Sequence, residues 1–140
     1  TIRQTQVVIS CGDIFEASGW KIIGCDTHFD TRVDDIVISK KSLHGQLVLN
    51  HGKKEEIEAV VENEAKRLGL QKKNDGLYEF PLGTVIRYDS SVDNQTYLML
   101  AMTELNIQHE GCMRVMILYF PYLVREYLDL MMARKIEKHY

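Results

Sequence analysis

Two loops of this sequence carry side chains that could contact a ligand. In the first, Cys11–Phe15, Gly12 allows the backbone to turn sharply or to approach a ligand closely. The ionised carboxylate of Asp13 only accepts hydrogen bonds, so it could accept one from the exocyclic amine of an adenine ring. The alternative is a turn or cap aspartate that bonds its own backbone. The three residues Gly12–Ile14 alone favour this alternative.

The second loop, Thr27–Asp35, is polar and acidic. A helix that begins near Asp34 would present free backbone N–H groups to a phosphate, and Arg32 would add a positive charge. The carboxylates of Asp30, Asp34 and Asp35 would instead repel a phosphate. They suit ribose hydroxyls, or they cap the helix.

Metal binding and catalysis are weakly supported by these residue types. His28 and the neighbouring acids could hold a metal, but a solvated acidic loop explains them more simply. No spacing of Ser, His and acid residues indicates a nucleophile with its base. We therefore expect no metal, no cofactor and no enzymatic activity.

The elements that must position these loops alternate between strands and helices. Short apolar runs predict strands at Gln6–Ser10, Lys21–Cys25 and Thr84–Tyr88. A further strand is an option at Gln46–Leu49. This alternation indicates an α/β layered domain, in which ligands sit on the loops that follow the carboxyl ends of strands.

The clearest helix is predicted over Lys53–Leu68. Its apolar residues fall on one face, acids occupy its first turn, bases occupy its last turn, and Gly69 follows it. Ser90–Asp93 resembles a capping box, which predicts a second helix from Asn94 to about Leu105.

Composition narrows the class of protein. The chain has 140 residues, enough for one compact domain, and a net charge of -3, which argues against a nucleic-acid partner. Its three cysteines are odd in number and lack C-x-x-C spacing, so we expect neither a disulfide framework nor a zinc site. Because disulfides are rare in reducing compartments, we also expect a cytoplasmic location. The apolar stretch Val115–Met132 contains Pro121 and several charges, so we do not expect it to span a membrane.

Three segments together resemble a known family. These are Gly12–Phe15, residues 21–70 and residues 80–106. They are similar to the macro domain of the membrane-anchored effector in bacterial Thoeris antiphage defence, over about Gln6 to Asn106. The resemblance implies a macro-like mixed sheet with flanking helices. It also implies binding of an ADP-ribose-type signal made by a partner enzyme with a TIR domain. In that family transmembrane helices precede the macro domain, so membrane association would come only through helices absent from this chain.

The resemblance also implies site residues. Asp13 and Ile14 match the adenine-binding loop of macro domains, and Phe29–Asp35 match the first ribose and phosphate loop. The ligand-binding candidates are Asp13, Ile14, Phe29, Asp30, Thr31, Val33 and Asp34. Gly24–Thr27 replaces the asparagine-rich segment of hydrolytic macro domains, which lowers the expectation of hydrolysis. A sensor module is the leading hypothesis; an ADP-ribosyl hydrolase and a non-catalytic assembly module, with self-association, stay open as alternatives.

The resemblance divides the chain at Asn106. Residues 1–106 form the N-terminal part of a macro-like nucleotide-binding domain, and residues 107–140 form a divergent tail. Codons permitted for Leu118–His139, regrouped by one base, can spell a glycine-rich segment similar to the phosphate loop that this family would place next. We therefore expect a frameshifted tail and a macro fold that is incomplete at its C-terminus and impaired in binding. The alternative is a genuine helical tail over Val115–Tyr140.

Overall fold

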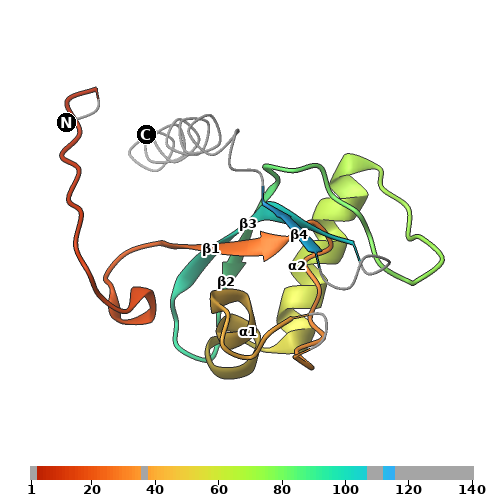
Figure 1. Cartoon of the computed structure of the whole chain (residues 1–140), viewed down its shortest axis with the longest axis horizontal. Helices are drawn as coiled ribbons and strands as arrows, with labels where there is room; N and C mark the ends of the chain where they lie inside the picture. Colours follow the sequence, from red (N-terminus) through yellow and green to blue (C-terminus); the bar gives the residue numbers. More distant parts are fainter. Residues whose placement is uncertain (1–2, 36–37, 107–111, 116–140) are drawn as a thin grey trace.

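A mixed β-sheet forms the centre of the protein. The structure, a computed structural model, describes residues 3–35, 38–106 and 112–115 (Figure 1). The long strand β3 (Thr96–Asn106) pairs in parallel with β1 (Lys21–Asp26) and antiparallel with β2 (Val85–Asp89). A fourth strand, β4 (Cys112–Val115), pairs antiparallel with the end of β3. The order β1-β3-β2, with β4 beside β3, confirms the predicted α/β class.

Helical segments cover one face of this sheet. They are η1 (Ile14–Glu16), α1 (Leu43–Gln46), η2 (Leu47–His51) and α2 (Lys54–Leu68). α2 lies along β2 (Figure 1) and buries Ile57, Val61 and Ala65 in the common core. No helix among the described segments is long and apolar enough to cross a membrane.

α2 was predicted correctly because its signals agree. Glu55 and Glu56 lie in its first turn, and Lys66 and Arg67 lie in its last, as the helix dipole favours. Gly69 ends the helix in the left-handed conformation, with φ 69°, and its N–H bonds the carbonyl oxygens of the last turn. The strands predicted at Lys21–Cys25 and Thr84–Tyr88 are also confirmed, as β1 and β2.

The helix predicted over Asn94–Leu105 is wrong, because this segment forms β3. Tyr97, Met99 and Ala101 are buried on the face that meets the helices. Leu98 and Leu100 on the alternate face are buried as well. A strand buried on both faces reads as a continuous apolar run, so its period does not separate it from a helix. Ser90–Asp93 is the turn between β2 and β3, in which the Ser90 N–H bonds the Gln95 carbonyl.

Two other expected elements are also corrected. Gln6–Ser10 is not a strand: it is exposed, with 74% of Val8 and 96% of Ile9 accessible, and no described strand pairs with it. Gln46–Leu49 is helical, at the junction of α1 and η2. A three-residue apolar run satisfies local strand propensity, but a strand also requires a hydrogen-bonding neighbour.

Thr27–Asp35 is a loop as expected, but among the residues that the structure describes on either side of Asp34, none begins a helix there. The next helix begins at Leu43, where the Ser42 hydroxyl accepts the Gly45 N–H.

Of the predicted tail, only Cys112–Val115 is described, as β4; the proposed frameshifted segment and the alternative tail helix otherwise lie outside the described residues.

Candidate functional site

The loop after β1 is built around the buried carboxylate of Asp26. Its Oδ1 accepts the backbone N–H of Asp30 at 3.1 Å, and its Oδ2 accepts the backbone N–H of His28 at 3.4 Å. The His28 ring nitrogen Nδ1 lies 3.3 Å from the same Oδ2. Asp26 therefore joins the end of β1 to the turn that carries the predicted site residues.

Phe29 occupies the bend of this turn. Its φ is 47°, a left-handed backbone conformation that costs energy for a bulky residue. Its buried ring meets Phe80 edge-on, with centroids 5.1 Å apart, which holds the residue in place. Phe29 thus contributes to the hydrophobic core as well as to the wall of the pocket described next.

A pocket of about 370 Å³ opens beside this turn. Phe29, Asp30 and Thr31, three of the predicted site residues, line it together with His28. The other walls come from α2 and from the loop that follows it: Glu58, Val61, Glu62, Lys72, Gly76, Leu77 and Tyr78. The loop after β1, which the sequence singled out, therefore does line a cavity at the carboxyl end of a strand.

The polar groups of the pocket are held by one another. Thr31 Oγ1 donates to Glu58 at 2.8 Å, and the Tyr78 hydroxyl donates to Glu62 at 2.8 Å. The hydrogen bond from Tyr78 keeps the pKa of Glu62 below its usual value, and in turn raises the pKa of Tyr78. Lys72 Nζ lies 3.7 Å from Glu62. The pocket thus offers carboxylates that accept hydrogen bonds from hydroxyl groups, and one lysine.

Asp30 is buried and already paired. Its two carboxylate oxygens accept the Arg32 guanidinium at 2.6–3.1 Å, and Oδ1 also accepts the Arg32 backbone N–H at 2.9 Å. Arg32 itself is half exposed, so the pair neutralises the acid while leaving a donor at the surface. This arrangement removes much of the repulsion toward phosphate that the sequence suggested.

Asp13 and Ile14 lie near the other end of β1. Phe15, their neighbour in η1, packs on Tyr97, which pairs with the first residue of β1, whereas the pocket follows the last. A strand of this length spans about 17 Å. The structure therefore does not bring the two predicted loops to one end of the sheet.

The remaining predicted residues have varied surroundings. The exposed Asp13 carboxylate accepts the Phe15 N–H at 2.9 Å and caps η1, which is the local alternative foreseen for it. Ile14 and Val33 pack against the core, and Asp34 is exposed. None of these four lines the pocket beside β1.

Sequence reasoning missed two residues of the loop's support, Asp26 and His44. His44 Nδ1, on α1, lies 3.8 Å from Asp26 Oδ1, and His44 Nε2 is buried without a hydrogen-bond partner. Burial alone would raise the pKa of Asp26, but hydrogen bonds and the charges of the two histidines lower it. Asp26 is the last residue of β1 and stands directly after its apolar run, which is the one signal that could have indicated it.

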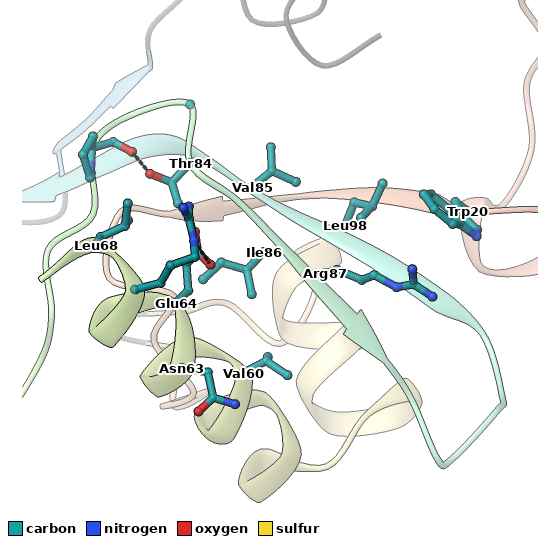
Figure 2. A pocket seen from close by; sticks show the side chains of 13 residues that line it. Trp20, Val60, Asn63, Glu64, Leu68, Thr84, Val85, Ile86, Arg87 and Leu98 are labelled. Atoms are coloured by element: carbon teal, nitrogen blue, oxygen red, sulfur yellow. Dashed lines mark hydrogen bonds and ion pairs between the residues drawn. The ribbon is translucent and has the colours of Figure 1, made fainter. Parts of the chain in front are cut away.

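A larger hollow, of about 790 Å³, runs along the outer edge of β2 (Figure 2). Val60, Leu68 and other residues of α2 form one side, and Trp20 and Leu98 lie at the far end (Figure 2). The Arg87 guanidinium stacks over the Trp20 ring at 4.9 Å and also bonds Asp89. No motif marked this hollow in the sequence.

Among the described residues, no three His, Cys, Asp or Glu side chains are placed to share a metal ion. Cys11 and Cys25 are free cysteines. The pocket beside β1 is lined by carboxylates that accept hydrogen bonds from hydroxyl groups and by a lysine, and these groups suit a polar ligand.

Comparison with known proteins identifies the family. A family model described as "Thoeris protein ThsA, Macro domain" matches residues 7–120, and so continues beyond Asn106. The Thoeris protein ThsA of Bacillus amyloliquefaciens (strain Y2) is 33% identical over 78 residues, which cover 52% of this chain and 26% of the relative. This chain thus matches about a quarter of that protein's length. With its mixed α/β sheet, the chain belongs to the family of ThsA macro domains of Thoeris antiphage defence.

Proposed function

We propose that this chain binds an ADP-ribose-type nucleotide, as the sensor part of a Thoeris effector. The signal would be made by a partner enzyme with a TIR domain. The effector would reach a membrane only through helices outside this sequence. Family membership supports the class of ligand, and the pocket at the carboxyl end of β1 supports the place.

The pocket beside β1 carries this proposal. Its volume lies at the lower end of the range of about 300–1,000 Å³ for small-molecule sites, which suits part of a dinucleotide-sized ligand. Glu58 and Glu62 can accept hydrogen bonds from ribose hydroxyls, and Lys72 can pair with a phosphate. Phe29, Asp30 and Thr31 complete the wall, so we keep them as ligand-contact residues.

Calorimetric titration of the whole chain with ADP-ribose tests the proposal. Lys72→Ala should weaken binding about tenfold, because one charge-assisted hydrogen bond to phosphate is lost. The matched control is Lys73→Ala: this lysine is the next residue, pairs with Glu79 and does not line the pocket. Heat of binding that is absent in the wild type, or equal affinity in the two variants, would contradict the proposed site.

The proposal retains the frameshift hypothesis for residues 107–140. If the shift is real, the nucleotide sequence across codons 100–140 spells the glycine-rich segment in the alternative frame and stays open beyond it. A closed or unrelated frame would reject the hypothesis. A repaired chain would then be titrated beside this one, and tighter ADP-ribose binding by the repaired form would show that the present tail impairs the domain.

A further inference from the structure

The turn that lines the pocket depends on one buried side chain. Asp26 accepts two backbone N–H groups of the turn, from His28 and Asp30, and Phe29 between them has φ 47°. The Phe29 N–H also bonds the Asp26 carbonyl oxygen at 3.2 Å. A left-handed phenylalanine persists only where its surroundings impose that shape. The Asp26 carboxylate supplies a large part of that constraint.

His28 makes the strength of this constraint depend on a proton. Its Nδ1 lies 3.3 Å from Asp26 Oδ2, and its side chain is 17% exposed, so solvent protons reach it. When protonated, His28 gives Asp26 a charge-assisted hydrogen bond; when neutral, it gives a weaker one or none. His28 also lines the pocket, so the same residue contacts the turn's support and the ligand space.

We propose that Asp26 is a positioning residue for the ligand pocket, and that protonation of His28 strengthens its hold on the turn at Phe29 and Asp30. The first part concerns the free protein. The consequence for ligand affinity rests on the proposed function.

The neighbouring titratable groups leave a window in which His28 alone changes charge within this cluster. Its hydrogen bond to Asp26 raises its pKa above 6.5. Burial lowers the pKa of His44, which faces Asp26 from α1, so His44 loses its proton at a lower pH than His28 does. The pKa of Asp26 is lowered, and the buried Cys25 thiol has a raised pKa.

Two further carboxylates act on His28. Asp30 faces it from the same loop, and Asp75 acts from the loop after α2. The negative charges of both carboxylates favour the protonated form of His28 and raise its pKa further. As the pH rises above 6.5, the hold on the turn therefore weakens as His28 loses its proton.

Amide hydrogen exchange of the Asp30 N–H, divided by its intrinsic rate at each pH, tests the proposal in the free chain. Its protection should fall about fivefold between pH 6.5 and 8.5, because a charged hydrogen bond is replaced by a neutral one. His28→Gln should remove this dependence without disturbing the buried carboxylate. Asp26→Asn should lower protection at both pH values. Asp35→Asn removes an exposed carboxylate of the same loop and should behave as the wild type.

The results distinguish the role of Asp26 and His28 in the free protein from their effect on ligand affinity. Protection that does not change with pH in the wild type, or the same change in His28→Gln, overturns it. Titration with ADP-ribose should show affinity that weakens in parallel from pH 6.5 to 8.5 in the wild type but not in His28→Gln. Absence of ADP-ribose binding at every pH would reject the proposed function, while the exchange data would still decide the role of Asp26.

Discussion

Phe15 stacks face to face on His51, with ring centroids 4.0 Å apart and ring planes 3° apart. The contact joins η1, which precedes the sheet, to η2, which precedes α2. The Tyr97 ring also packs against the Phe15 ring, with centroids 6.2 Å apart. One phenylalanine therefore fixes the place of the Asp13 loop relative to the sheet.

Phe15→Ala should release η1 from the core. Phe15 is partly buried, so we expect a loss of about 2 kcal/mol in the free energy of unfolding, roughly half the cost at a fully buried site. Urea denaturation measures this change. Ile9→Ala is the control, because Ile9 is almost fully exposed and its removal should change stability by less than about 0.5 kcal/mol. Equal effects of the two substitutions would show that the stack does not anchor η1.

Asp13 can be assigned to a cap or to a ligand by two substitutions. Asp13→Asn keeps an oxygen that accepts the Phe15 N–H, whereas Asp13→Ala removes it. If Asp13 also binds an adenine amine, Asp13→Ala should weaken ADP-ribose binding by about 1–3 kcal/mol, and Asp13→Asn should weaken it too because the charge is lost. Affinity unchanged in both variants, with only Asp13→Ala less stable, would restrict Asp13 to capping.

Gly45 should not tolerate a methyl group. Replacing glycine by alanine inside a helix normally adds stability, by up to about 1 kcal/mol. At Gly45 the added Cβ would collide with the carbonyl oxygen of Ser39, a backbone atom that cannot swing away. Gly45→Ala should therefore destabilise the protein by about 1–3 kcal/mol, as measured by thermal unfolding. Gly12→Ala meets no atom within 4 Å and should leave the midpoint nearly unchanged. A more stable Gly45→Ala would contradict the close approach of α1 and Ser39.

What the sequence could predict depends on whether the signal is local. α2 has its apolar face, its charged ends and Gly69 within seventeen residues, and it was predicted almost to the residue. β3 was mistaken for a helix because it is buried on both faces, so its apolar residues run on without the alternation of a half-exposed strand. The strand predicted at Gln6–Ser10 is wrong because its Val and Ile residues favour a strand locally, but no described strand pairs with the segment.

Some residues of the candidate site could likewise be predicted from the local sequence, and others could not. Phe29, Asp30 and Thr31 follow β1 directly, so the rule that ligands sit beyond the carboxyl ends of strands was enough to indicate them. Glu58, Glu62 and Tyr78 line the same pocket from α2 and the loop after it, and only the packing of α2 reveals them. Asp26 and His44 lie eighteen positions apart, and their approach within 3.8 Å depends on the path of the intervening loop.

His44 should make the protein less stable in mild acid. Burial lowers its pKa below 6.5, although the charges of Asp26 and Asp30 oppose this shift. Below pH 6.5 the unfolded chain therefore binds a proton that the folded chain does not. The stability conferred by neutral His44 is complete above pH 6.5 and decreases as the pH falls from 6.5 toward the folded-state pKa.

The slope of stability against pH between 5 and 6.5 measures this effect. One proton limits the slope to about 1.4 kcal/mol per pH unit. His44→Gln cannot titrate, so its slope should be smaller, whatever its stability at pH 7.5. His28 has a raised pKa, which gives a slope of the opposite sign, so His28→Gln should not flatten the wild-type slope in this range. If His44→Gln retains the full slope, the pKa of His44 is not lowered in the folded protein, and the charges of Asp26 and Asp30 offset its burial.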